Sequence, residues 1–283
     1  MKIAIASGKG GTGKTTISTN LAHYLSQTQE IILVDLDVEE PNSGLFIHGN
    51  LDKIYIKTRQ VPNWEQENCI LCGDCVKNCN FNAIAKMSDE IMIFPQLCHS
   101  CYACSELCPK DALPMIGLPM GVLQKFKLDK LHFIESKLDI GEEMAVPLIA
   151  QTVDFVEEEF DKDILRIYDS PPGTACPVIE TLKHSDYVFL VTEPTPFGLN
   201  DLKLAVETVR KLEKDFAVII NRYGIGDNEV EKYCEEENIE ITAKFPQSRK
   251  VAELYSSGEL LYNKVPEFMA ELEKLELKIK SIN

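Results

Sequence analysis

A glycine-rich loop near the amino terminus constrains the fold more than any other segment of this 283-residue chain. The loop lies between an apolar run at residues 3–6 and a helical pattern over residues 14–26, and it reads Ser7-Gly8-Lys9-Gly10-Gly11-Thr12-Gly13-Lys14-Thr15-Thr16. A strand, a G-x-x-x-x-G-K-[ST] loop and a helix, in that order, are typical of a phosphate-binding α/β fold. The sequence therefore predicts a nucleotide site built on a sheet.

Each residue type in the loop is suited to bind part of a nucleotide or its metal ion. Glycines let successive backbone N–H groups face a polyphosphate, and the helix amino terminus adds a partial positive charge. Lys14 is suited to pair with β- and γ-phosphate oxygens, and Thr15 to ligate Mg²⁺. A glycine turn that binds nothing would leave two lysines uncompensated at a helix amino terminus. We therefore expect ATP and Mg²⁺ as ligands, with a phosphate-binding set of Gly8, Gly10, Gly11, Thr12, Gly13, Lys14, Thr15 and Thr16.

Short buried-strand patterns alternate with helical patterns at both ends of the chain. The remaining strands are expected at residues 31–35, 165–169, 187–192 and 216–221, and the helices at residues 142–160, 199–214, 229–237 and 266–281. This alternation predicts an α/β fold with a doubly wound, mostly parallel sheet. The apolar spacing over 265–282 is accompanied by alternating Glu and Lys, which favours packing on the sheet over membrane contact.

The alternation is interrupted by a cysteine-dense segment with an internal repeat. Eight of the ten cysteines lie between positions 69 and 108, in two C-x₂-C-x₂-C-x₃-C runs offset by 29 residues. We expect residues 62–113 to form an inserted, small ferredoxin-like α+β domain, and residues 1–61 and 114–283 to form the discontinuous nucleotide-binding domain.

The spacing is that of bacterial two-cluster ferredoxins, in which the fourth cysteine of each run ligates the other cluster. It predicts two [4Fe–4S] clusters, one held by Cys69, Cys72, Cys75 and Cys108, the other by Cys98, Cys101, Cys104 and Cys79. Structural zinc is the alternative, but zinc favours paired C-x₂-C knuckles separated by longer loops. Cys108 is followed by the usual proline, Pro109, whereas Cys79 is followed by Asn80.

Lys9 gives the loop the form K-G-G-x-G-K-[ST], and in this the sequence resembles the MinD and Mrp branch of P-loop ATPases. The resemblance continues in four further segments, residues 35–42, 169–174, 192–198 and 221–222. With the cysteine segment, the chain is similar to MinD-superfamily ATPases that have an inserted ferredoxin domain, and this likeness spans nearly the whole sequence.

The resemblance implies further roles. Lys9 is expected to reach the phosphates of a partner subunit in an ATP-bound homodimer, and Asp37 to orient the attacking water; with Lys14 they form the expected catalytic set. Asp35 ends the same strand, from which both carboxylates are expected to reach the γ-phosphate region. Asp169, at a Walker B position, is expected to hold Mg²⁺ through water. Asn221 and the backbone of residues 246–248 resemble the family's adenine-recognition elements.

Cys176 follows the second switch, at an offset similar to that of a cluster-ligating cysteine in the nitrogenase iron protein. A small buried residue is the simpler interpretation of Cys176, because an unpaired cysteine often belongs to the core. Cys234 has no expected role.

The composition of the chain narrows the classes of partner that it is expected to bind. The chain has 29 basic and 45 acidic side chains and a formal net charge of −16, which disfavours nucleic acid and anionic lipid. Clustered cysteines at metal-ligand spacing, without a signal-like start, predict a cytoplasmic protein. The function expected first is an ATP-gated electron-transfer switch with a redox or metal-cofactor partner protein. A cluster or cofactor assembly and carrier factor, and a MinD-like positioning ATPase with sensory or structural clusters, are the alternatives.

Overall fold

The computed structural model describes residues 1–282 and divides into two compact units. The first unit comprises residues 1–55, residues 123–137 and the chain from residue 145 onward. The second comprises Ile56–Val122 and Leu138–Met144. The predicted insert, residues 62–113, lies within the second unit, which extends beyond it on both sides.

The first unit is built on a parallel sheet. Within the described residues the strand order is β11-β10-β9-β1-β8-β2-β7-β6-β3, and the pairs from β11 to β7 are parallel. The parallel strands are β1 (Lys2–Ala6), β2 (Ile31–Asp35), β7 (Leu131–Leu138), β8 (Leu165–Asp169), β9 (Tyr187–Thr192), β10 (Asp215–Tyr223) and β11 (Ile241–Pro246). The central strands β1, β2, β8 and β9 are rich in β-branched and aromatic residues and are almost entirely buried, as expected for a sheet covered on both faces.

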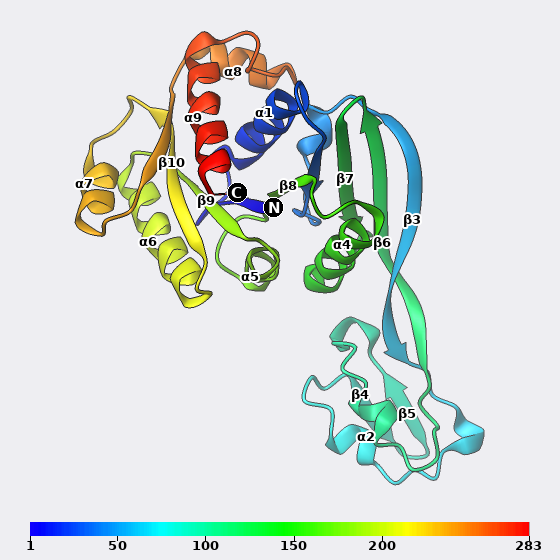
Figure 1. The fold of residues 1–283 in the computed structure, drawn as a ribbon. Helices are drawn as coiled ribbons and strands as arrows, with labels where there is room; N and C mark the ends of the chain where they lie inside the picture. The colour runs from blue at the N-terminus through cyan, green and yellow to red at the C-terminus, as the bar shows by residue number, and fades with distance from the viewer. Residues whose placement is uncertain (283) are drawn as a thin grey trace. The chain divides into compact units, whose positions relative to one another are not determined.

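Helices cover both faces of this sheet (Figure 1). One face carries α1 (Lys14–Ser26) and α9 (Pro266–Ile282), and the other carries α4 (Ala145–Glu159), α5 (Cys176–Lys183) and α6 (Pro196–Lys211). The shorter helices α7 (Glu229–Glu236) and α8 (Arg249–Ser256) flank β11 in sequence. This arrangement confirms the predicted α/β class with a mostly parallel sheet.

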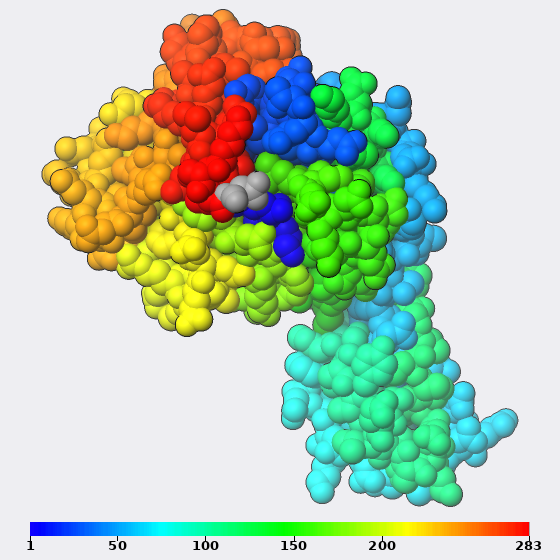
Figure 2. All heavy atoms as spheres, in the orientation of Figure 1, coloured from blue at the N-terminus to red at the C-terminus, as the bar shows by residue number. Residues whose placement is uncertain are grey.

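The face under α1 and α9 holds a large apolar core. Alternate residues of the strands, such as Ile3, Leu33 and Phe189, pack with the inner sides of the two helices. Figure 2 shows α1, in blue, and α9, in red, side by side, and the Tyr24 hydroxyl donates a 2.6 Å hydrogen bond to Glu276 between them. The carboxy-terminal helix therefore packs on the sheet, as predicted. No helix among residues 1–282 is both long and apolar enough to span a bilayer.

Two long strands, β3 (Asn50–Pro62) and β6 (Met115–Leu128), begin or end in the second unit and were not expected from the sequence. The rest of that unit consists of short elements around one antiparallel pair, β4 (Ile84–Met87) and β5 (Glu90–Ile93). The predicted helix over 142–160 begins at Ala145, because residues 138–144 belong to the second unit.

The sequence repeat of the second unit is also a repeat of backbone geometry. The 3₁₀ turn Gln66–Asn68 and helix α2 (Asp74–Lys77) recur 29 residues later as Pro95–Leu97 and α3 (Ala103–Glu106). Three left-handed positions recur at the same offset, as the pairs Leu71 and Ser100, Gly73 and Tyr102, and Asn82 and Asp111. Each cysteine run thus folds into the same loop.

Candidate functional site

The phosphate loop joins β1 to α1 in a conformation that requires its glycines. Gly13 precedes the helix with a φ of 94°, and a Cβ there would lie 2.1 Å from the side-chain nitrogen of Asn221. That nitrogen donates a 2.7 Å hydrogen bond to the Thr12 carbonyl. Asn221, predicted as an adenine-recognition residue, therefore also braces the phosphate loop from the end of β10.

An open cavity of about 420 Å³ lies over the loop. Its lining includes residues from the phosphate loop, Asp37 after β2, Asn221 of β10 and the segment after β11: Gly10, Gly11, Gly13, Lys14, Thr15, Thr16, Asp37, Asn221, Pro246, Gln247 and Ser248. The fold thus brings most of the predicted nucleotide residues to one cavity at the carboxyl ends of the strands. Gly8, Lys9, Thr12 and Asp169 are not part of this lining.

Lys14 points its amine into an acidic environment. Burial lowers the pKa of its amine, and the carboxylates of Asp169, Asp37 and Asp35 act in the opposite direction. A buried lysine near carboxylates at a helix amino terminus is suited to bind phosphate oxygens.

Asp35 and Asp169 are neighbours in the sheet, at paired positions of β2 and β8. Asp35 is fully buried, and its two oxygens accept hydrogen bonds from the backbone N–H groups of Asp37, Asn42 and Ser43. Asp35 therefore holds the loop after β2, in contrast to the expectation that it reaches toward the phosphates.

Asp169 accepts a 3.1 Å hydrogen bond from the Ser43 hydroxyl through Oδ2, while its Oδ1 is buried without a hydrogen-bond partner. Burial raises the pKa of both Asp35 and Asp169. A buried carboxylate oxygen with no partner, beside the phosphate loop, fits the predicted role of Asp169 toward a hydrated Mg²⁺.

Asp37 is partly exposed and lines the cavity. Burial raises the pKa of its carboxyl to about 6, although a backbone hydrogen bond at Glu40 and the charge of Lys14 lower it. Such a carboxylate is ionised at neutral pH and accessible to a water molecule in the cavity. Ser43, Glu193 and Arg222 join this site in the structure although the sequence analysis assigned them no role.

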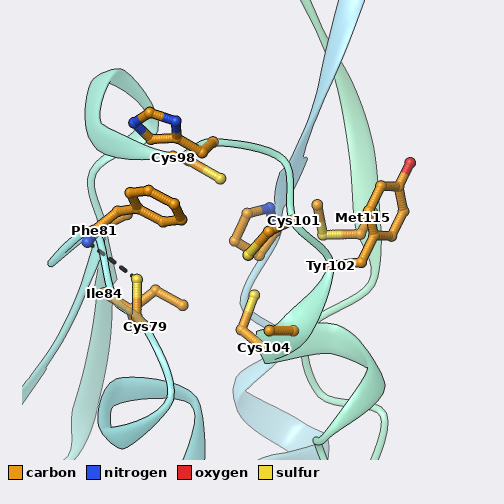
Figure 3. Close-up of a pocket in the computed structure, with 12 residues that line it drawn as sticks. Cys79, Phe81, Ile84, Cys98, Cys101, Tyr102, Cys104 and Met115 are labelled. Carbon is orange, nitrogen blue, oxygen red and sulfur yellow. Dashed lines mark hydrogen bonds between the residues drawn. The ribbon is translucent and has the colours of Figure 1, made fainter. Parts of the chain in front are cut away.

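The second unit contains two cavities that divide the eight clustered cysteines equally. One cavity is lined by Cys79, Cys98, Cys101 and Cys104, and the sulfur atoms of these residues point into it (Figure 3). The other is lined by Cys69, Cys72, Cys75 and Cys108. In each cavity, three cysteines come from one run and the fourth from the other run.

The surroundings of the two cavities differ. Phe81 and His99 stack at a centroid distance of 3.9 Å beside the first cavity, and Tyr102 lines it in a left-handed conformation. Ile70, Asp74 and Lys110 line the second cavity. Aromatic rings therefore line part of the first cavity, whereas the described lining of the second has aliphatic and charged side chains and no aromatic ring.

Backbone amides are directed at the cysteine sulfurs. The N–H groups of Leu71, Ala83 and Ala112 donate to the Sγ atoms of Cys69, Cys79 and Cys108 at 3.2–3.4 Å. Burial raises the pKa of the Cys75 thiol, and that of the Cys104 thiol to about 11. These two thiols stay protonated at neutral pH unless a metal displaces the proton.

A buried ion pair lies behind the first cavity. Arg59, 3% exposed, donates from Nε to Glu142 at 2.9 Å and from a terminal nitrogen to the Cys98 carbonyl at 3.3 Å. No local sequence pattern indicates this pair, because its members are 83 positions apart. It places a permanent cation next to one cysteine loop.

The other side chains that could ligate a metal ion do not cluster. Among residues 1–282, no three His, Cys, Asp or Glu side chains converge at the spacing that one metal ion requires. Cys234 is buried in α7, whereas Cys176, expected in the core, is exposed at the start of α5. The expectation for Cys176 was wrong because the loop after Asp169 leaves the sheet before the helix begins.

Comparison with known proteins identifies the family. The model of the CobQ/CobB/MinD/ParA nucleotide-binding domain matches residues 3–261. The chain therefore belongs to this family, and it is an ATPase of the MinD and ParA type.

Two groups of curated relatives extend over almost the whole chain. An uncharacterized protein of Methanocaldococcus jannaschii is 30% identical, with 96% of each chain covered. The iron–sulfur cluster carrier protein of Pyrococcus furiosus is 26% identical and matches 99% of this chain and 87% of its own length.

Solved structures show the same fold. The septum site-determining protein MinD of Pyrococcus horikoshii, in complex with Mg-ADP, superposes with a TM-score of 0.63 at 17% identity, covering 99% of this chain and 96% of its own. The cell division ATPase MinD of Pyrococcus furiosus gives a TM-score of 0.62 at 18% identity, covering 100% and 99%.

Proposed function

We propose that this chain is an ATP-hydrolysing homodimeric switch that holds two [4Fe–4S] clusters and gates electron transfer to a partner protein. The observation that carries the proposal is the division of eight cysteines between two cavities, four each, within a chain whose other unit is a MinD-type nucleotide domain.

The cavities suit cubane clusters better than single ions. A [4Fe–4S] cluster is bound by four cysteine thiolates that stand around its volume, whereas four zinc ligands lie about 2.3 Å from one point. The four sulfurs around the first cavity point into a shared space (Figure 3), and among residues 1–282 no three donor side chains converge at the spacing of a single metal ion. The amide donors to Cys69, Cys79 and Cys108 are the contacts that tune a bound cluster's reduction potential.

The residues of the nucleotide site have three roles, which are to bind the nucleotide, to position the water and to support hydrolysis. Lys14 and the loop amides bind the phosphates, and Thr15 with Asp169 holds Mg²⁺. Asp37 orients the attacking water from the loop that Asp35 fixes. Lys9 contributes across the dimer, so that hydrolysis requires two subunits. When bound, the clusters supply one-electron chemistry, and the cycle of dimer closure controls a partner's access to them.

A second candidate function is cluster assembly and transfer. It is favoured by the likeness to the iron–sulfur cluster carrier protein of Pyrococcus furiosus. Four cysteine ligands per cavity, supported by amide hydrogen bonds, favour retention of a cluster over its release. Electron transfer is therefore the function we place first.

Anaerobic chemistry separates the two functions. The purified protein is expected to contain about eight iron and eight sulfide per chain. Dithionite-reduced protein should pass electrons to a one-electron dye faster with ATP than without it, and Lys14→Ala should lose this ATP effect along with ATP binding. If instead iron and sulfide move from the protein to an apo-ferredoxin in an ATP-dependent manner, the carrier function is correct. Stoichiometric zinc without sulfide would contradict both.

A further inference from the structure

A buried carboxylate lies between two cations at the edge of the nucleotide site. Glu193 follows β9 directly, and its side chain is only 8% exposed. One of its oxygens is 2.8 Å from an Arg222 guanidinium nitrogen, and the other is 3.7 Å from the Lys9 amine. Lys9, the lysine expected to act in a partner subunit, is therefore engaged by an acid of its own chain.

The backbone around Glu193 is fixed. Its carbonyl accepts a 2.8 Å hydrogen bond from the Thr195 N–H, and the Thr195 hydroxyl caps α6 by accepting from Gly198 at 3.0 Å. A Cβ at Gly198 would lie 2.2 Å from the Glu193 carbonyl, so this turn has no room to shift. The carboxylate stays where the turn places it.

The lysine is the movable member of the pair. Its side chain is 35% exposed, in contrast to the buried carboxylate, and a contact of 3.7 Å is longer than the charge-assisted hydrogen bond to Arg222. If Lys9 swings outward, Glu193 keeps its partner in Arg222. The ion pair can therefore break without leaving an unpaired buried charge.

We propose that Glu193 is a positioning residue that holds Lys9 within its own subunit until a second copy of the chain presents its bound nucleotide. This inference rests on the proposed ATP-dependent homodimer. In the free subunit Lys9 pairs with one carboxylate; in the dimer it exchanges that carboxylate for the more highly charged phosphates of the partner's nucleotide. Glu193 thus raises the nucleotide concentration at which dimers form and keeps Lys9 from engaging other anions.

Two substitutions at this contact should shift the nucleotide concentration needed for dimerisation in opposite directions. Glu193→Gln keeps the size of the side chain and removes its charge, so dimers should form at about two- to fivefold lower concentration of a non-hydrolysable ATP analogue. Arg222→Gln removes the competing guanidinium from Glu193, which should then hold Lys9 more tightly, so the analogue concentration at the midpoint of dimerisation should rise by a similar factor. Because Arg222 lines the nucleotide cavity, the ATP affinity of each monomer is measured separately.

The measurements are analytical ultracentrifugation and the rate of Lys9 acetylation by mass spectrometry in nucleotide-free protein. Glu193→Gln should speed Lys9 acetylation, and Glu207→Gln, which removes an exposed α6 charge paired with Lys211, is the matched control. Unchanged acetylation, or a dimerisation midpoint that stays or rises in Glu193→Gln, overturns the inference. Wild-type protein that stays monomeric with the analogue overturns the proposed dimer instead, while the acetylation rates still decide whether Glu193 holds Lys9.

Discussion

The two units of this chain differ in what holds them together. The first has a continuous apolar core in which strands and helices bury large side chains completely. In the described residues of the second, the buried clusters are small, and cysteines are members of them: Ile84, Ile91, Cys104 and Leu113 form one, and Val61, Ala83 and Cys98 another. A domain with so little apolar burial commonly depends on bound metal for its stability. The difference indicates that the cysteine loops are folding elements as well as ligand carriers.

Removal of iron is the strongest test of this contrast. Chelation under anaerobic conditions should raise amide hydrogen exchange in residues 62–113 by on the order of a thousandfold, because the free energy of metal binding is then lost from folding. Exchange in β1, β8 and β9 should remain slow. Reconstitution with iron and sulfide is the control and should restore protection. Equal protection of both units after chelation would refute the contrast.

A substitution confined to the first unit should strongly slow ATP hydrolysis and leave the second unit unchanged. Asp37→Ala is expected to lower ATP turnover by about 10² or more while ATP binding and iron content stay unchanged, because only the water-positioning carboxylate is lost. The exposed neighbour Glu39 provides the control substitution Glu39→Ala, which should be near wild type. Unchanged turnover in Asp37→Ala would show that Asp37 does not orient the attacking water.

The pH dependence of hydrolysis should report the same carboxylate. Because burial raises the pKa of Asp37 to about 6, the ionised form that orients the attacking water is present above this pH and is lost below it. Single-turnover hydrolysis should therefore fall about tenfold per pH unit below the apparent pKa. Asp37→Asn is the control, since its residual rate should lack this step. A rate that is flat between pH 5 and pH 7 excludes the assignment.

Within the second unit, single cysteine substitutions should sharpen the division of ligands. Cys108→Ser is expected to damage the cluster at Cys69, Cys72 and Cys75, and Cys79→Ser the cluster at Cys98, Cys101 and Cys104, each lowering iron content by roughly half. Electron paramagnetic resonance of the reduced variants distinguishes the two clusters, and Cys176→Ser serves as control. Loss of the cluster formed by the same run would show that the fourth ligands do not cross.

The smallest effect is expected from the buried ion pair behind the first cavity. Arg59→Met should lower the reduction potential of the cluster at Cys98, by on the order of 50 mV, because a nearby cation favours the added electron. Glu142→Gln should raise it, and the other cluster's potential should change less in both variants. Redox titration followed by paramagnetic resonance measures both. Equal shifts at the two clusters would mean that Arg59 acts through the fold rather than through its charge.

Local patterns predicted the buried parallel strands and missed the strands that continue into the second unit. The buried runs in β1, β2, β8 and β9 have no polar interruption, so their prediction was direct. β3 is mostly exposed, and its polar residues conceal a strand. Pro119 lies inside β6, because a proline is tolerated where its missing N–H is not required by the sheet.

The residues of the candidate site also divide into those that a local sequence pattern predicts and those that it does not. Spacing alone grouped the cysteines and the phosphate loop, because their partners lie close in sequence or repeat at a fixed interval. Contacts such as Glu193 with Lys9, or Ser43 with Asp169, join residues more than a hundred positions apart. Nothing in a local pattern specifies them; the order of strands in the sheet does.

The crossing of the fourth cysteine has an evolutionary consequence. A single 29-residue repeat has three cysteines for one cavity and one for another, so it cannot complete either cavity by itself. Two copies related by a twofold axis complete both, which is the geometry of a symmetric dimer. Joining them in one chain replaces assembly at cellular concentration with assembly at the much higher effective concentration of a tether. The two halves therefore complete their cavities only together, and loss of one half would leave both cavities incomplete.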